Sequence, residues 1–182
     1  MNNNTILFFT STILYWQNLL SFNETKQIVI NSLQFLVKNN KIKLYGYVIM
    51  PNHIHLLIEV LNPQSKNENF QHSFLSYTAH QFKKYLKANN NNELKKYEVN
   101  DSDRTYQFWE RNPLSIEIYS REVAEQKLRY IHNNPYQEKW NFMIAGEDAC
   151  NGGIYKYSSE EFYNTNYDEM NMLTHYLDYF EK

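Results

Sequence analysis

The sequence predicts an α+β fold of the ferredoxin-like type: a four-stranded antiparallel sheet with helices on one face, followed by a C-terminal helix and a tail. Two observations lead to this fold class. Apolar residues recur either at every second position, as in strands, or at three- and four-residue spacing, as in helices. The resulting order of elements is β-α-β-β-α-β and then a helix, which is the split βαβ pattern.

The N-terminal part of the chain supplies a strand and a long helix. We expect the strand over residues 6–15, an apolar stretch interrupted by Thr10, Ser11 and Thr12. The helix is expected over Asn23–Lys38, with apolar residues at helical spacing. Ser21 or Asn23 could accept a hydrogen bond from the first turn and cap it.

A hairpin follows this helix. Its first strand is expected over residues 42–49 and its second over His53–Val60. Residues 50–52 form a tight connection, because Pro51 has a fixed φ and no amide donor. In the second strand the apolar residues alternate, so one of its faces is expected to be buried.

The second helix and the fourth strand complete the sheet motif. Helical spacing predicts a helix over residues 71–88, and four consecutive asparagines at 89–92 predict a loop after it. Alternation predicts a strand over residues 114–119. Towards the C-terminus we expect only a short helix, over residues 158–163.

A final helix is expected over Arg121–Asn133. Ser120 is suited to cap its N-terminus, and Glu122 lies favourably in its first turn. Pro135 ends the helix, because the residue before a proline is disfavoured in the α region.

Composition indicates a single domain over residues 1–182, with a core at about 5–135 and a C-terminal extension over 136–182. The single cysteine, Cys150, excludes an intramolecular disulfide and favours a reducing cytoplasm. No apolar run approaches the roughly 18 residues that would span a bilayer, so we expect no membrane partner.

Charge gives only a local indication of a nucleic-acid partner. The net charge is −2, which does not favour DNA binding by the whole surface. Residues 81–97, however, hold five lysines and one acid, and Lys83, Lys84 and Lys87 fall on the second expected helix. This patch is either a DNA-binding surface or an ordinary solvated helix face.

Two histidines begin the third expected strand. Residues two apart in a strand point to the same side, so His53 and His55 project together and could share one cation. The alternative is that both are partly exposed strand residues with backbone partners. Glu59 has the same period and is a possible further ligand.

The last helix carries a phenol and an amide on one face, since Tyr130 and Asn134 are four residues apart. Gln126 lies one turn earlier and could orient a phosphate or a water molecule. Such a pair suits metal-assisted phosphoryl transfer, with the amide as third metal ligand and the phenol as nucleophile. In a chain with 16 tyrosines, spacing alone does not select Tyr130 over Tyr77, Tyr85 or Tyr119.

Two segments together resemble a known family. Residues 50–57, which contain the His-Ile-His motif, resemble the histidine signature of the single-tyrosine (HUH) transposases of the IS200 type. Residues 128–135, with Tyr-Ile-His-Asn-Asn-Pro, resemble their catalytic helix. The similarity is greatest to the branch associated with repetitive extragenic palindromes (REP). Residues 106–112 and 156–159 also look like stretches found in that branch.

The resemblance implies a set of functional residues. His53, His55 and Asn134 would bind a divalent metal, Mg²⁺ or Mn²⁺, and Tyr130 would attack single-stranded DNA near a hairpin, leaving a 5′-phosphotyrosine. The protein would act as a monomer or a homodimer. The residues expected to contact DNA are Lys83, Lys84, Lys87, Tyr106, Trp109 and Arg111.

Exposed aromatic side chains would stack on bases, each contributing about 1–3 kcal/mol. Tyr85, Tyr106, Phe108 and Trp109 are the candidates, although Trp109 could equally be a core residue. Two other functions remain open: a nucleic-acid-binding regulator of this fold that has lost catalysis, and an unrelated metalloenzyme with a small substrate. The intact His53, His55, Tyr130 and Asn134 argue against lost catalysis.

Overall fold

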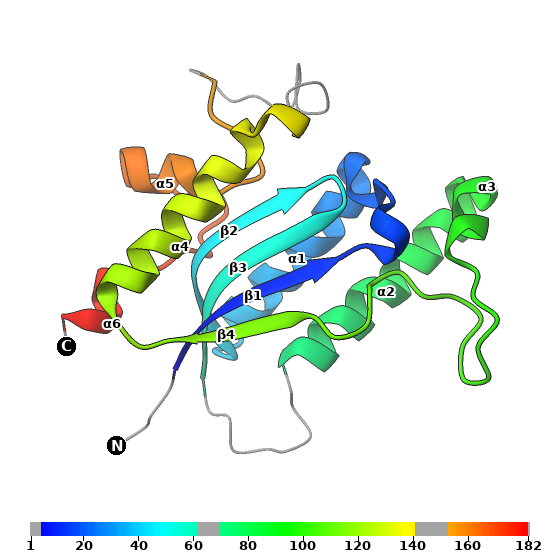
Figure 1. The fold of residues 1–182 in the computed structure, drawn as a ribbon, viewed down its shortest axis with the longest axis horizontal. Coiled ribbons are helices and arrows are strands. Elements are labelled where there is room, and N and C mark those ends of the chain that lie inside the picture. Colours follow the sequence, from blue (N-terminus) through cyan, green and yellow to red (C-terminus); the bar gives the residue numbers. More distant parts are fainter. Residues whose placement is uncertain (1–4, 62–69, 141–152, 182) are drawn as a thin grey trace.

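The computed structural model describes residues 5–61, 70–140 and 153–181. Its sheet consists of β1 (Ile6–Thr12), β2 (Ile42–Met50), β3 (His53–Val60) and β4 (Leu114–Ile118). The strand order is β2-β3-β1-β4, and every neighbouring pair is antiparallel (Figure 1). The ferredoxin-like fold class is therefore confirmed.

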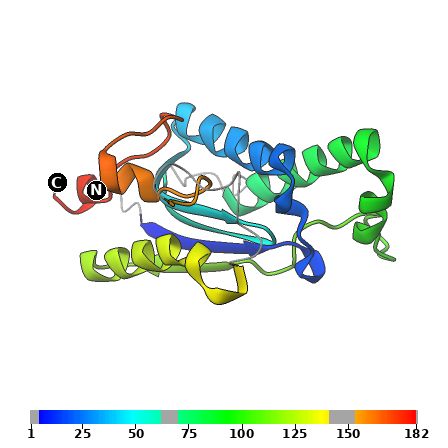
Figure 2. The ribbon, with the colours of Figure 1, turned by 90° about the horizontal axis from the view of Figure 1, so that it is seen from above.

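The long helices lie in two layers, one on each face of the sheet. Helices α1 (Asn23–Lys38) and α2 (Phe70–Asn89) cover one face, and α4 (Arg121–Asn133) lies on the other (Figure 2). The expected helices on one face are thus α1 and α2, and the C-terminal helix forms the opposite layer.

Strand alternation produces these two layers. Phe9 of β1 points to the α1/α2 side, where its ring packs against Phe70 and Phe74 at centroid distances of 5.5 and 6.5 Å. Phe8, its neighbour, points to the α4 side and contacts Tyr130 at 6.0 Å. Both faces of β1, β2 and β3 are therefore largely buried, whereas β4 is mostly exposed. The burial of both faces accounts for strands that are apolar on both sides.

The remaining helices are short. Within the described residues they are α3 (Asn91–Leu94), α5 (Glu160–Thr165), α6 (Leu177–Phe180) and five 3₁₀ turns. The turns span Leu14–Trp16, Leu19–Ser21, Lys95–Tyr97, Asn134–Tyr136 and Glu138–Trp140. In the part of the chain described here, none of the helices could cross a membrane.

The first strand is shorter than the sequence predicts. It ends at Thr12 instead of residue 15, because Tyr15 and Trp16 adopt φ values of 54° and 56°. This left-handed conformation is incompatible with a strand.

Three further details of the predicted helices are wrong: a cap, a loop and a boundary. Helix α1 is capped by neither Ser21 nor Asn23: its N-cap residue is Phe22, and the hydroxyl of Thr25 bonds back to the carbonyls of Leu19 and Phe22. The expected loop at 89–92 is reduced to Asn90, whose side chain accepts from Glu93 N at 3.1 Å and so caps α3. The expected helix at 158–163 begins only at residue 160.

The C-terminal segment covers the free edge of β2. Tyr157 O accepts from Ile49 N and Tyr47 O accepts from Ser159 N, both at 2.9 Å. Farther along the same edge, Leu44 O accepts from Thr174 N at 2.9 Å. These bonds pair backbone groups that an exposed edge strand would otherwise offer to another chain.

The same segment fixes α4. Ser159 Oγ bonds His132 Nε2 at 2.9 Å, and Tyr176 donates its phenolic hydrogen to Glu125 at 2.8 Å. Residues 153–181 therefore contact α4 at His132 and at Glu125, and the sheet packs against its other side.

Gly46 allows α4 to approach β2 closely. A Cβ atom at this position would lie 2.5 Å from Cδ2 of Leu128 and 3.4 Å from Oγ of Ser159. Substituting Ala therefore forces α4 outward or Leu128 out of its position. We expect Gly46→Ala to lower the free energy of unfolding by about 1–3 kcal/mol, measured by urea denaturation.

A double-mutant cycle with Leu128→Ala tests the cause of this loss. Truncating Leu128 removes the clashing atom, so the double variant should lose less stability than the two single losses combined. Additive losses would show that the contact between Gly46 and Leu128 is not responsible.

Candidate active site

The two histidines lie side by side under α4. They occupy the first and third positions of β3 and point to the α4 face, with their ring centroids 4.8 Å apart. Both side chains are almost completely buried. The strand register pairs His53 with Thr12 and His55 with Thr10 of β1, which sets their positions along the sheet.

A polar partner orients each imidazole through Nδ1. Asn52 Oδ1 lies 2.7 Å from Nδ1 of His53, and Thr10 Oγ1 lies 2.7 Å from Nδ1 of His55. With Nδ1 engaged, Nε2 of each ring is the nitrogen left for another partner. This arrangement is usual for metal-binding histidines, whose second nitrogen is hydrogen-bonded to fix the ring.

Asn134 brings an amide to the same place. It follows the last residue of α4, is buried, and interacts with the side chain of His53. Within the described ranges, Asn134 Oδ1 and His55 Nε2 are buried with no hydrogen-bond partner. Buried polar atoms are nearly always paired, so these two unpaired atoms are candidates for contact with a further ligand.

The donor set suits a divalent cation: two imidazole nitrogens and one amide oxygen. In residues 5–61, 70–140 and 153–181, no group of three or more His, Cys, Asp or Glu side chains could hold a metal. The Asn134 amide is the third side chain placed to complete a site with the two histidines.

Burial keeps both imidazoles neutral. It is the main cause that lowers the pKa of His53 to about 4, with a smaller effect of Lys139 and an opposing one of Asn134. It also lowers the pKa of His55 to about 3, assisted by the charges of His53, Lys127 and Lys139. The neutral imidazole is the form that binds metals, so both rings are in the binding form at neutral pH.

Tyr130 lies beside His55 and is open to solvent. The two ring centroids are 5.1 Å apart, and the tyrosine side chain is 45% exposed. The Phe8 ring of β1 contacts both rings and stacks on His55 with a centroid distance of 5.4 Å. Lys127, one turn earlier on α4, places its Nζ 4.8 Å from the centre of the Phe8 ring. The site thus combines a phenol, a nearby cation and a buried donor set.

The other candidate tyrosines lie elsewhere. Tyr77 and Tyr85 are on α2, across the sheet from α4, and Tyr119 follows β4 and bonds Glu117. Among the described contacts, none of the three reaches the histidines. Gln126 is exposed on α4, one turn before Tyr130.

Glu59 is not placed as a third ligand. It shares the strand face of the histidines, but it accepts a hydrogen bond from Tyr45 at 2.5 Å and lies 3.9 Å from Nζ of Lys43. Glu59 is buried in this separate cluster. Asn134 is the side chain that interacts with a histidine of the pair, His53.

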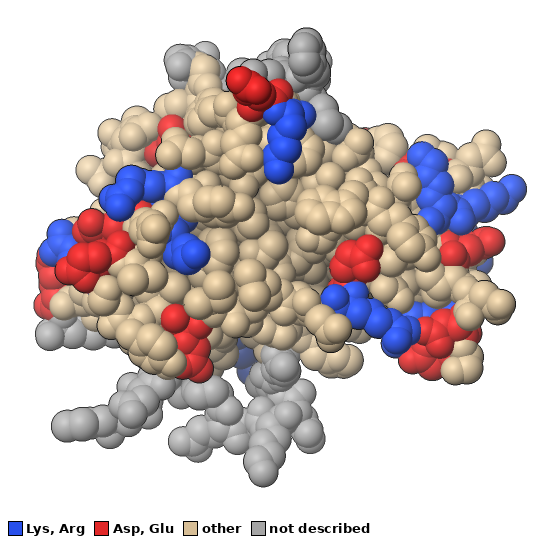
Figure 3. Space-filling view, in the orientation of Figure 1, with Lys and Arg blue, Asp and Glu red and all other residues tan. Residues whose placement is uncertain are grey.

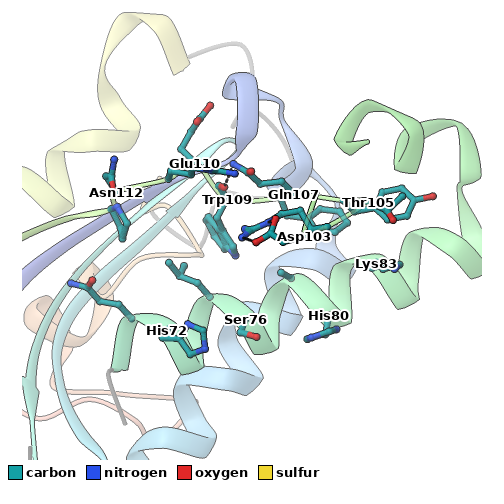
Figure 4. A pocket seen from close by; sticks show the side chains of 18 residues that line it. His72, Ser76, His80, Lys83, Asp103, Thr105, Gln107, Trp109, Glu110 and Asn112 are labelled. Atoms are coloured by element: carbon teal, nitrogen blue, oxygen red, sulfur yellow. Dashed lines mark hydrogen bonds and ion pairs between the residues drawn. The ribbon is translucent and has the colours of Figure 1, made fainter. Parts of the chain in front are cut away.

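Several of the expected DNA contacts surround a different cavity, of about 900 Å³, between α2 and residues 103–113. Figure 4 shows Lys83 along its α2 wall and Trp109 on the opposite side. Tyr106 and Arg111 also line it, whereas Lys84 and Lys87 do not. Because α2 and α4 are on opposite faces of the sheet, this cavity is separate from the histidine site.

The expectation that Trp109 stacks on bases is wrong. Its ring is buried, and its Nε1 donates to Thr78 Oγ1 at 2.9 Å, which makes it a core residue. Phe108 is buried in the same way. Arg111 is paired with Asp101, and Lys83 lies over the ring of Tyr106 at 4.8 Å.

Sequence reasoning missed the residues that orient the site. Thr10 and Asn52 were not identified as partners of the histidines, nor was Trp16 placed near His53, where its ring centroid lies 6.4 Å away. For Asn52 the signal was its position directly before His53. For Thr10 it was a polar residue within an apolar strand.

The face that carries the site has few charges. Figure 3 shows it largely uncharged in the middle, with Lys and Arg at scattered positions nearer the margins. A phosphate at this face would meet individual cations instead of a continuous basic surface.

Comparison with known proteins shows which family this chain belongs to. The family model described as "Transposase IS200 like" matches residues 13–134. A solved structure of a REP-associated tyrosine transposase bound to a REP hairpin is similar, with a TM-score of 0.57 and 13% identity, over 94% of this chain and 86% of that one.

A second structure, of a transposase candidate from Deinococcus radiodurans R1, has a TM-score of 0.47 and 16% identity, over 73% of this chain and 92% of that one. No curated protein matches the sequence. The similarity to the REP-associated transposase structure shows a shared fold. The family model covers more than half of the chain and includes both histidines, the tyrosine and the asparagine, and this chain therefore belongs to the family of IS200-like transposases.

Proposed function

We propose that this protein is a metal-dependent single-strand DNA endonuclease and strand-transfer enzyme that acts through a covalent 5′-phosphotyrosine on Tyr130. One observation carries the proposal: His55 Nε2 and Asn134 Oδ1 are buried without partners in the described structure, beside a tyrosine that is open to solvent. A metal ligand set next to an accessible nucleophile suits phosphoryl transfer.

His53, His55 and Asn134 would hold the cation, Mg²⁺ or Mn²⁺. When bound, it would polarise a non-bridging phosphate oxygen and neutralise charge that develops in the transition state. The ring partners Asn52 and Thr10 engage Nδ1 of each imidazole, which leaves Nε2 of each ring for the cation.

Tyr130 supplies the nucleophile. Its Oη forms a bond to phosphorus as the bond from phosphorus to the 3′ oxygen breaks, and the phenolic proton is lost as the 3′-hydroxyl gains one. A neutral phenol is a weaker nucleophile than a phenolate, so the phenolic proton must be withdrawn during attack. The new phosphodiester keeps the energy of the old one, so that another 3′-hydroxyl can reverse the step without ATP.

The substrate is proposed to be single-stranded DNA next to a hairpin. The REP hairpin bound by the structural neighbour supports a hairpin in the substrate. Lys127 and Lys139, whose charges lower the pKa of His55, would meet the scissile phosphate.

The nucleophile is tested by Tyr130→Phe. This change removes one exposed oxygen and keeps the ring packed on Phe8 and His55, so the fold and Mn²⁺ binding should be unchanged. The covalent product should be lost completely. Incubation with Mn²⁺ and a labelled hairpin oligonucleotide, followed by a denaturing gel, detects the adduct in the wild type.

Tyr77→Phe, which alters an exposed tyrosine on α2, is the matched control and should form the adduct normally. An adduct that persists in Tyr130→Phe would refute the assignment. Cleavage by the wild type with no adduct would indicate water as the nucleophile.

The ligand set is tested by metal binding. The double variant His53→Ala/His55→Ala should lose Mn²⁺ binding and cleavage, and Asn134→Ala should weaken both, with circular dichroism spectra like that of the wild type. Isothermal titration with Mn²⁺ measures the affinity. Glu59→Gln is the control, because Glu59 shares the strand face but belongs to another cluster. Wild-type affinity in Asn134→Ala, with loss in Glu59→Gln, would reverse the assignment.

Ring orientation is tested by Thr10→Val and Asn52→Ala. Each removes the partner of one Nδ1 and leaves the metal ligands in place. We expect a 10- to 100-fold loss, by order of magnitude, in Mn²⁺ affinity or cleavage rate. Ser11→Ala, at a neighbouring position that points to the other face of the sheet, should have much less effect. Equal losses in all three variants would indicate general destabilisation.

A further inference from the structure

Two exposed aromatic residues directly after β1 have an unusual backbone. Tyr15 and Trp16 have φ values of 54° and 56°, and their side chains are 64% and 62% exposed. Bulky residues rarely adopt the left-handed conformation, and consecutive ones do so only where the surroundings impose it. Such backbone strain concentrates at functional sites. The other two tryptophans, Trp109 and Trp140, are buried.

Side chains from neighbouring segments hold this strained turn. Glu110 Oε1 accepts from the backbone amide of Tyr15 at 2.8 Å. Asn52 donates from Nδ2 to the carbonyl of Trp16 at 3.3 Å, and the same Asn52 side chain bonds His53 through its Oδ1. One residue therefore positions both a proposed metal ligand and the exposed indole.

Four rings form a row through the site. The centroid distances are 6.4 Å from Trp16 to His53, 4.8 Å from His53 to His55, and 5.1 Å from His55 to Tyr130. The two imidazoles thus separate Trp16 from Tyr130. The indole lies at the His53 end of the site and the phenol at the His55 end.

We propose that Trp16, with Tyr15 beside it, is a stacking platform for the base of the nucleotide immediately 5′ to the cleaved bond. This inference rests on the proposed function. In an in-line displacement, the attacking oxygen and the leaving 3′ oxygen lie on opposite sides of phosphorus. With Tyr130 at the His55 end, the leaving nucleotide extends towards His53 and Trp16.

The platform would also retain the cut strand. After cleavage the leaving nucleotide ends in a free 3′-hydroxyl, and stacking on Trp16 keeps that end near the phosphotyrosine. For rejoining, the 3′ oxygen bonds to phosphorus, the bond from phosphorus to Tyr130 breaks, and the phenol regains a proton. Stacking accepts every base, since each has a π face, so Trp16 sets position and not sequence.

The test scans a hairpin oligonucleotide with 2-aminopurine, a fluorescent base whose emission is quenched by stacking. One base at a time is replaced along the single-stranded part, and binding is measured in the Tyr130→Phe background, where no strand is cut. The wild-type protein locates the cleaved bond on a denaturing gel. We expect strong quenching at the nucleotide 5′ to that bond.

Trp16→Asn is the diagnostic variant, because asparagine tolerates the left-handed backbone but has no ring. It should abolish quenching at that position and weaken binding about 5- to 150-fold. Trp16→Phe should retain part of both. Tyr167→Asn removes another aromatic side chain that is 62% exposed and should change neither. On an oligonucleotide that lacks the stacked base, Trp16→Asn should cause no further loss.

The outcomes separate this inference from the proposed function. If the wild type forms no covalent adduct, the proposed function fails, and the placement of a leaving nucleotide fails with it. If the adduct forms but no position shows quenching that depends on Trp16, or if the quenched base lies 3′ to the cleaved bond, only the inference is overturned. A change in sedimentation of DNA-free Trp16→Asn would assign the ring to a contact between protein copies and would also overturn it.

Discussion

The close packing of α4 against the sheet is the constraint on which the whole site depends. The histidines belong to β3, whereas Tyr130 belongs to α4 and Asn134 follows its last residue, so a small displacement of the helix would separate the phenol and the amide from the imidazoles. Gly46 makes the close approach possible, because any side chain at this position would meet Leu128. The polar contact between His132 and Ser159 then fixes the helix along the edge of β2.

The C-terminal segment has a structural role in this arrangement. The family match ends at residue 134, yet the groups that hold α4 come from residues 153–181. The segment pairs with the outer strand β2 and places Tyr176 against α4. It therefore covers an exposed sheet edge and supports α4 at the same time, and both roles follow from the position of β2 at the edge of the sheet.

The site gathers features that cost stability elsewhere in a protein. Imidazoles are buried with strongly lowered pKa values, an amide oxygen has no partner in the described structure, and two aromatic residues combine exposure with a left-handed backbone. Proteins tend to violate the rules of polar pairing and local conformation at functional sites, where a ligand or substrate completes the interactions. These features lie around His53 and His55, in a different place from the cavity beside α2. They therefore favour the histidine site over that cavity as the functional site.

The sequence by itself determined the order of elements, the fold class, the shared direction of the two histidines and the shared helix face of Tyr130 and Asn134. Each of these follows from local periodicity, which is the same in any context. Only the tertiary structure decided that Asn134 and not Glu59 joins the histidines, that Trp109 is a core residue, and that β1 ends at Thr12 with Trp16 exposed beside His53. These outcomes depend on groups distant in sequence: Tyr45 engages Glu59, Thr78 accepts from Trp109, and Glu110 and Asn52 hold the turn at residues 15 and 16. No local pattern contains such contacts, because they arise only when the strands and helices pack together.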